Sequence, residues 1–242
     1  MKNNELNRRD FLRVVGGAGV AGAGTLLASC RPEAPAQSEV PAGPRLVRFP
    51  EKNELILLTD RPPQLETPLH YFQQDVTPNE AFFVRWHLEG IPTSVDLDAF
   101  RLQVGGHVRT PLQLSVDDLK TQFTPVSLLA VNQCSGNARS LFDPRVPGGQ
   151  WKQGAVGNAL WTGVRLKDIL ERAGVKAGAV DVTLQGLDRA PLPSTADFEK
   201  SLDIGHALDG DVVVAYEMHG VPPPMLNGFP LRLVVPARHD EP

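Results

Sequence analysis

Apolar residues in this chain gather in short runs between polar stretches, a pattern that predicts short strands and few helices. Alternating apolar positions at Phe100, Leu102 and Val104 predict a strand over residues 100–108. The unbroken apolar run 124–131 predicts a buried strand that delivers the following polar residues into a loop. Further strands are predicted at residues 81–87, 180–185, 211–216 and 230–235.

Two helices are predicted from local start and stop signals. Ser115 is a suitable N-cap for a helix over residues 115–121. A second helix over residues 166–173 should stop at Gly174, because glycine readily adopts the left-handed conformation that ends a helix. Strands and helices do not alternate regularly, so the pattern predicts an α+β fold and not a Rossmann fold.

The first thirty residues have the layout of an export signal. Arg8-Arg9-Asp10-Phe11-Leu12 matches the twin-arginine pattern. The apolar segment 14–28 is short for a membrane span, which needs roughly 20 residues. Leu27-Ala28-Ser29-Cys30 resembles a bacterial lipobox, in which Cys30 would carry a lipid anchor. The alternative is a plain signal peptide with an incidental cysteine. Either interpretation predicts export by the twin-arginine route, to the periplasm or the outer face of the membrane.

The composition fits one globular domain after this signal. Hydrophobic residues make up 41% of the 242 positions and charged residues 21%, which are ordinary values. The net charge of −4 gives no reason to expect nucleic acid as a partner. The predicted organisation is an export signal over residues 1–29, a flexible tether over 30–48, one domain over 49–236 and a polar tail over 237–242.

Cys134 is the residue on which the functional interpretation depends. A lone cysteine is often a small buried hydrophobe, but Cys134 is followed by polar and small residues in a loop context. The nearby Arg139 would favour its thiolate form. Without a CxxC motif a tetrahedral zinc site has little support. Two alternatives remain: a nucleophile with His87 as its base, or a single thiolate on a soft, cofactor-held metal.

Several separate blocks of sequence carry a specific resemblance. They are Phe82-Phe83-Val84-Arg85-Trp86-His87-Leu88, Gln133-Cys134-Ser135-Gly136-Asn137-Ala138-Arg139-Ser140, Trp161-Thr162-Gly163-Val164-Arg165-Leu166, Gly186-Leu187-Asp188 and Asn227-Gly228-Phe229-Pro230-Leu231-Arg232. In order and spacing, residues 59–236 resemble the sulfite oxidase family, whose members bind a molybdenum–pyranopterin (molybdopterin) cofactor.

This resemblance implies an α+β molybdopterin-binding domain with mixed sheets and short helices. It implies that Cys134 is the sole protein ligand of molybdenum and that Arg85, Arg139 and Trp151 line the substrate pocket. Arg232 would grip the cofactor phosphate with two parallel hydrogen bonds. The cofactor-binding residues that it implies are Phe83, Val84, Arg85, His87, Cys134, Asp188, Asn227 and Arg232.

The resemblance also implies an enzyme that oxidises sulfite to sulfate and passes electrons to a c-type cytochrome, with no heme in this chain. The alternatives are a related molybdoenzyme that reduces methionine sulfoxide or nitrate, and a truncated, inactive relic tethered to the membrane. Family members continue after the equivalent of Pro236 into a β-sandwich dimerisation domain. The tail 237–242 resembles nothing in the family, so we expect the chain to lack this domain and to be a monomer.

Overall fold

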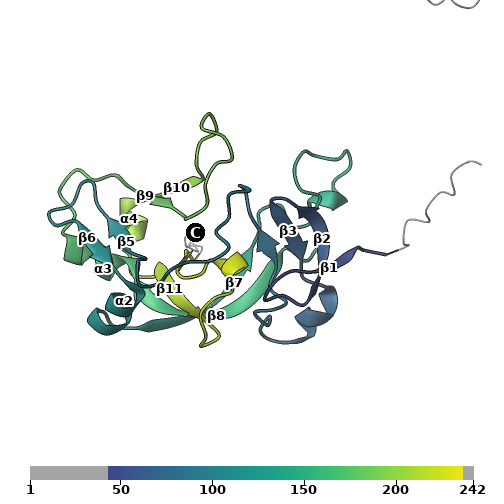
Figure 1. Cartoon of the computed structure of the whole chain (residues 1–242), viewed down its shortest axis with the longest axis horizontal. Coiled ribbons are helices and arrows are strands. Elements are labelled where there is room, and N and C mark those ends of the chain that lie inside the picture. Colours follow the sequence, from purple (N-terminus) through teal and green to yellow (C-terminus); the bar gives the residue numbers. More distant parts are fainter. Residues whose placement is uncertain (1–42, 237–242) are drawn as a thin grey trace, which may run out of the picture. The chain divides into compact units, whose positions relative to one another are not determined.

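The computed structural model describes residues 43–236, which belong to the unit Pro41–Pro242 of the chain (Figure 1). The export signal 1–29 with Cys30, most of the tether and the tail 237–242 lie outside the described residues, so these assignments stay predictions. No described helix is both long enough and apolar enough to cross a membrane.

A four-stranded antiparallel sheet, in the order β12-β11-β8-β7, carries the candidate site. Its strands are β7 (Val126–Gln133), β8 (Val156–Arg165), β11 (Val213–Met218) and β12 (Arg232–Val234). Figure 1 shows β8 as a long, curved strand. The sequence patterns did not predict β8, because its glycines and polar residues interrupt the apolar alternation.

A second antiparallel sheet has the order β1-β2-β3-β4. Its strands are β1 (Leu46–Arg48), β2 (Glu54–Asp60), β3 (Pro63–Glu66) and β4 (Val84–Arg85). The first described strand, β1, begins at Leu46, inside the segment 30–48 that was predicted to be a tether. Its pairing with β2 makes these last residues of the segment part of the folded domain. Two hairpin sheets complete the strands: β5 (Leu102–Val104) with β6 (Leu112–Leu114), and β9 (Asp181–Gln185) with β10 (Glu199–Asp203).

Both predicted helices are present, as α2 (Val116–Gln122) and α3 (Leu166–Ala173). The Ser115 hydroxyl accepts from the Asp118 N–H at 3.0 Å, and the Asp118 carboxylate accepts from the Ser115 N–H at 2.9 Å, which completes a capping box. Gly174 ends α3 in the left-handed conformation with φ 68°. The short helices are η1 (Leu69–Gln73), η2 (Arg139–Leu141), α4 (Ile204–Ala207) and η3 (Met225–Asn227). The α+β prediction is confirmed.

Three strand predictions need correction. The predicted strand 100–108 forms only the three-residue β5, and residues 105–108 belong to the connection to β6. The predicted strand 81–87 forms only the two-residue β4, because the preceding residues enter the core from a loop. The prediction that run 124–131 is buried was wrong: β7 is an edge strand in which half-buried and exposed positions alternate. Leu129 and Val131 are 56% and 64% exposed, because only one face of the strand packs on the core.

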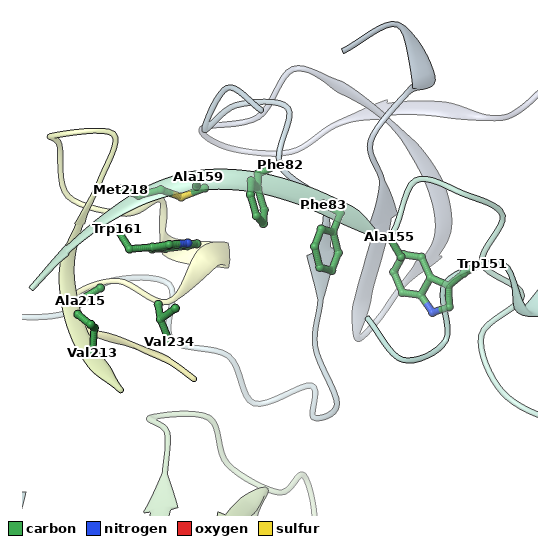
Figure 2. Packing of buried hydrophobic residues seen from close by; sticks show 10 residues of the cluster. All are labelled: Phe82, Phe83, Trp151, Ala155, Ala159, Trp161, Val213, Ala215, Met218 and Val234. Carbon is green, nitrogen blue, oxygen red and sulfur yellow. The ribbon is translucent and has the colours of Figure 1, made fainter. Parts of the chain in front are cut away.

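Two apolar clusters cover opposite faces of the β12-β11-β8-β7 sheet. Val214 and Tyr216 of β11 point into a cluster with residues of α2 and α3. The alternate β11 residues Val213 and Ala215 point to the other face. That second cluster, shown in Figure 2, contains Phe82, Phe83, Trp151, Ala155, Ala159, Trp161, Val213, Ala215, Met218 and Val234.

Gly163→Ala is predicted to destabilise the domain. A Cβ at Gly163 would lie 2.1 Å from the Val214 carbonyl oxygen and 2.5 Å from the Ala215 Cα, so two backbones would have to separate. We expect a loss of about 1–3 kcal/mol in the free energy of unfolding, measured by chemical denaturation. Gly105→Ala, where a Cβ meets open space, is the control and should change stability by less than about 0.5 kcal/mol. Equal stability of both variants would contradict the prediction.

Candidate functional site

Cys134 occupies the first position of the loop that follows β7. Its backbone N–H donates to the Ala155 carbonyl at 2.9 Å, and its carbonyl accepts from the Asn137 N–H at 2.9 Å. The free, half-buried thiol packs against the Figure 2 cluster and lies 3.4 Å from the Gly136 N–H, which points at the sulfur. The loop position predicted from the sequence is therefore present.

Backbone hydrogen bonds hold the Cys134 loop against residues 151–155. The Ser140 N–H donates to the Trp151 carbonyl at 3.0 Å, and the Ala138 N–H donates to the Lys152 carbonyl. The Asn137 side chain accepts from the Ala155 N–H at 3.0 Å. These bonds fix where the thiol sits relative to the end of β8.

Arg139 and Trp151 both lie next to this loop. A Cβ at Gly136 would be 2.9 Å from Arg139 Nη1 and 3.0 Å from Trp151 Cδ1, so both side chains lie close against this glycine. Trp151 is 1% exposed. The one hydrogen bond of the Arg139 guanidinium is a long one, 3.4 Å, to the Gly149 carbonyl, and no carboxylate of residues 43–236 pairs with it. Within the described residues, a cation without an anionic partner thus lies against Gly136, whose N–H points at the thiol.

An aromatic row connects this region to the far part of the sheet. Phe83 meets Trp151 edge-on with ring centroids 6.4 Å apart, Phe82 stacks on Phe83 at 5.4 Å, and Phe82 meets Trp161 edge-on at 6.0 Å. Figure 2 shows the two phenylalanines between the two tryptophans, along the curve of β8. Offset and edge-on contacts of this kind are favourable beyond the area that they bury.

Arg85 follows the pair Phe82-Phe83 after one residue, Val84. Its strand β4 pairs with β3, with Val84 opposite Leu65 and Arg85 opposite Gln64. The Arg85 guanidinium donates to the Trp86 carbonyl at 2.7 Å and, like Arg139, has no ion pair within the described residues. Val84, between Phe83 and Arg85, is fully buried and packs in a small core cluster with Leu55 and Leu65.

His87 and Asp188 lie near each other and near Arg85. The His87 ring stacks on Phe198 at 4.3 Å. Burial lowers the pKa of His87, and the charge of Arg85 lowers it further, while Asp188 opposes this effect. A backbone hydrogen bond of 2.9 Å from Arg189 to Gly90 ties the Asp188 loop to this segment. No hydrogen bond joins His87 to Cys134 in the described structure, so the Cys–His nucleophile gains no support.

Asn227 and Arg232 form the other end of the site. The Arg232 guanidinium lies over the Trp161 ring, 5.2 Å from its centroid, and donates to the Asn227 carbonyl at 2.9 Å. Burial lowers the pKa of Arg232 to about 10, and no carboxylate of residues 43–236 pairs with it. A half-buried guanidinium with no carboxylate partner among residues 43–236 favours binding of an anion.

Two further buried charges, Lys52 and Glu66, were not predicted from the sequence. They are 5% and 2% exposed. The Glu66 carboxylate accepts from the Lys152 N–H, beside the Cys134 loop. Burial raises its pKa, and the backbone N–H groups of Lys152 and Gly154 oppose the rise. In the sequence both residues look like ordinary surface charges.

The arrangement is therefore a free thiol in the loop that carries Arg139 at one end, and a half-buried Arg232 over Trp161 at the other end, with Arg85 on the neighbouring strand β4. It suits a long ligand with a soft atom at one end and an anionic group at the other. The described residues contain no group of three His, Cys, Asp or Glu side chains that could hold a metal ion.

Comparisons with known proteins point in the same direction. The family model described as "Oxidoreductase molybdopterin binding domain" matches residues 87–239. Mitochondrial sulfite oxidase of Rattus norvegicus is 38% identical over 189 residues, which cover 74% of this chain and 33% of that protein. Nitrate reductase [NAD(P)H] of Hordeum vulgare is 32% identical over 212 residues, which cover 85% of this chain and 23% of that protein.

A solved structure is also similar, that of the sulfane dehydrogenase SoxCD from Paracoccus pantotrophus. The TM-score is 0.63 at 25% sequence identity, and the match covers 89% of this chain and 52% of that chain. The present chain spans about a third of the length of the mitochondrial sulfite oxidases that it matches. The family match begins at residue 87, so Lys52, Glu66, Phe83 and Arg85 lie outside it.

Glu66→Gln is predicted to remove a pH-dependent loss of stability. Because burial raises the folded-state pKa of Glu66 above its ordinary value of 4.5, the folded state retains a proton that the unfolded state releases. Stability therefore falls as the pH rises from about 4.5 through the raised pKa. The substituted glutamine still offers an oxygen to the Lys152 N–H but cannot ionise.

Melting temperatures of wild type and Glu66→Gln, measured between pH 4 and 8, test this. We expect the wild type to lose stability relative to the variant as the pH rises, until a plateau is reached. The exposed Glu54→Gln on β2 is the control for loss of one carboxylate. A difference between wild type and Glu66→Gln that stays constant with pH would refute the prediction.

Proposed function

Because the chain belongs to the oxidoreductase molybdopterin binding domain family, which includes the sulfite oxidases, we propose that it is a molybdopterin-dependent oxidoreductase that oxidises sulfite to sulfate. The observation that carries the proposal is the free Cys134 thiol in the same loop as Arg139, whose guanidinium has no carboxylate partner among residues 43–236. A thiolate is a suitable ligand for a redox metal, and guanidinium groups are suitable for an oxyanion.

The residues present fit the molybdenum–pyranopterin cofactor. Cys134 would ligate the metal and Arg232 would bind the phosphate, since Arg232 is half-buried and pairs with no carboxylate of residues 43–236. His87 and Asp188 would bind the pterin, with Phe83, Val84 and Asn227 holding the adjoining loops. When bound, the cofactor supplies oxygen-atom transfer coupled to a two-electron redox change.

The remaining work falls to side chains around the thiol. Arg85 and Arg139 would bind and orient the sulfite dianion through charge-assisted hydrogen bonds. The reaction balances as sulfite plus water giving sulfate, two electrons and two protons. A c-type cytochrome would take the electrons one at a time. Trp151, buried under the loop, would keep Arg139 and Cys134 at a fixed separation.

Nitrate reduction is the second candidate, favoured by the match to barley nitrate reductase over a larger share of the chain. Nitrate is also an oxyanion, and a guanidinium group can bind two of its oxygens at once. Sulfite remains the first candidate because the sulfite oxidases are more similar in sequence. Sulfite-dependent reduction of cytochrome c, compared with nitrate consumption driven by a reduced dye, separates the two activities.

Cys134→Ser is predicted to abolish sulfite oxidation and leave the fold intact. The hydroxyl has nearly the same volume as the thiol, but oxygen is a harder and more basic ligand for the metal. Turnover with cytochrome c and the circular dichroism spectrum are the measurements. Gln133→Ala, an exposed change at the preceding residue, is the control. Wild-type turnover by Cys134→Ser would show that the thiol is not the ligand.

Arg85→Gln is predicted to raise the KM for sulfite. The substitution removes a charge-assisted hydrogen bond worth about 1.5–3 kcal/mol, which corresponds to a rise of roughly 10- to 100-fold. Arg48→Gln removes the same charge from an exposed position of the same sheet and should leave KM unchanged. An unchanged KM in Arg85→Gln at moderate salt would make Arg85 a structural residue.

A further inference from the structure

We propose that Lys52 is a positioning residue for the anion-binding end of the site: it fixes the side chain of Asn227 and thereby the place of Arg232. The inference rests on the proposed function in one respect only, that the anion is the cofactor phosphate. Lys52 lies outside the part of the chain that the family model matches, in the turn between β1 and β2.

All three donors of the Lys52 ammonium are used inside the protein. Its Nζ donates to the Asn79 carbonyl at 2.6 Å, to the Phe82 carbonyl at 3.1 Å, and to Asn227 Oδ1. An ammonium has three N–H groups and no acceptor, so these bonds exhaust it. The side chain therefore joins residues 79–82 to η3.

The ammonium also decides which way the Asn227 amide faces. In its ammonium form Lys52 can only donate, so Oδ1 faces it, and Nδ2 then donates to the Phe83 carbonyl at 3.1 Å. Asn227 is 2% exposed, so no water can replace either bond easily. If the Asn227 amide were reversed, its NH2 group would face the Lys52 ammonium, donor against donor. Its oxygen would face the Phe83 carbonyl, acceptor against acceptor.

Arg232 depends on the same residue through the backbone. The Asn227 carbonyl accepts the Arg232 guanidinium at 2.9 Å, and the aromatic face of Trp161 supports it from one side. Glu51, next to Lys52, makes a second hydrogen bond between this turn and η3, because its carboxylate accepts from the Met225 N–H at 2.8 Å. The turn that carries Lys52 thus holds η3 at both its first and its last residue.

The charges around Lys52 suit this task. Burial lowers its pKa to about 7, Glu80 and Glu51 oppose the shift, and the charge of Arg232 adds to it. Two neighbouring cations with no ion pair in the described residues repel each other until an anion binds. Removing Lys52 should therefore loosen Asn227 and Arg232 and weaken retention of the anion.

Arg85 should be affected much less. It is held by the pairing of β4 with β3, to which Lys52 makes no hydrogen bond. A positioning role for Lys52 at the anion end therefore predicts faster loss of the cofactor at a nearly unchanged KM for sulfite. A purely structural role predicts that both change together.

A double-mutant cycle on the full-length holoprotein tests the inference, with Lys52→Met, Asn227→Leu and the combination. The readouts are the rate of pterin release, followed by its fluorescence at several salt concentrations, and the KM for sulfite of the loaded enzyme. We expect Lys52→Met to release pterin roughly tenfold faster, with KM changed less than twofold. If Lys52 acts through Asn227, the double variant should release no faster than the quicker single variant.

Lys176→Met, which removes an exposed lysine whose backbone alone is hydrogen-bonded, is the charge control and should behave as wild type. Should Lys52→Met fail to fold, Lys52→Gln, which keeps an N–H donor, takes its place in the cycle. Wild-type release by the Lys52 variant, or release effects that multiply in the double variant, would overturn the inference.

A wild-type protein purified without molybdenum or pterin would instead overturn the proposed function. The inference is then judged in the same proteins by hydrogen exchange of residues 225–232. Exchange there should rise equally in the single and double variants, and unchanged exchange in Lys52→Met would overturn the positioning role.

Discussion

Burial of Lys52 and partial burial of Arg232, neither of which pairs with a carboxylate of residues 43–236, is the constraint on which the site depends. Removing a charge from water is costly unless hydrogen bonds replace the solvent. Lys52 meets this cost with three acceptors and Arg232 with one carbonyl and the Trp161 ring. These acceptors belong to residues 79–82 and to η3, so both segments must stay where the cations need them. A bound anion would lower the cost and stabilise the folded state.

The row of aromatic rings Trp161-Phe82-Phe83-Trp151 links the two ends of the site, Arg232 and the Cys134 loop. Phe82 and Phe83 pack between Trp161, under Arg232, and Trp151, under the Cys134 loop. Gly157 permits the close approach, since a Cβ there would lie 2.6 Å from the Phe82 ring. Closely packed interiors yield little to strain. The Cys134 thiol and the half-buried Arg232 guanidinium thus pack at the two ends of one aromatic row along β8.

The parts that the sequence predicted are those with local signals. Ser115 with Asp118 and the glycine at 174 mark helix ends within a few residues, and both helices are present. The loop position of Cys134 followed from one apolar run. By contrast, the apolar residues of β8 do not alternate with polar ones in the sequence. The hydrogen-bond partner of Lys52, Asn227, lies 175 residues further along the chain. Glu66 likewise bonds Lys152 across 86 residues. Only the folded chain reveals such pairs.

The β1-β2-β3-β4 sheet is part of the functional unit, although the family match begins after it. The backbone N–H of Thr67, in the loop after β3, donates to the Gly154 carbonyl at 3.0 Å. The Thr77 N–H donates to the carbonyl of Asn158 on β8, and the Asn158 N–H donates to the Thr77 hydroxyl. Without residues 43–86 these groups, together with Lys152 opposite Glu66, would lose their partners beside the Cys134 loop. The same segment supplies Lys52 to one end of the site and Arg85 to its middle. The geometry of the matched residues therefore depends on residues that precede them.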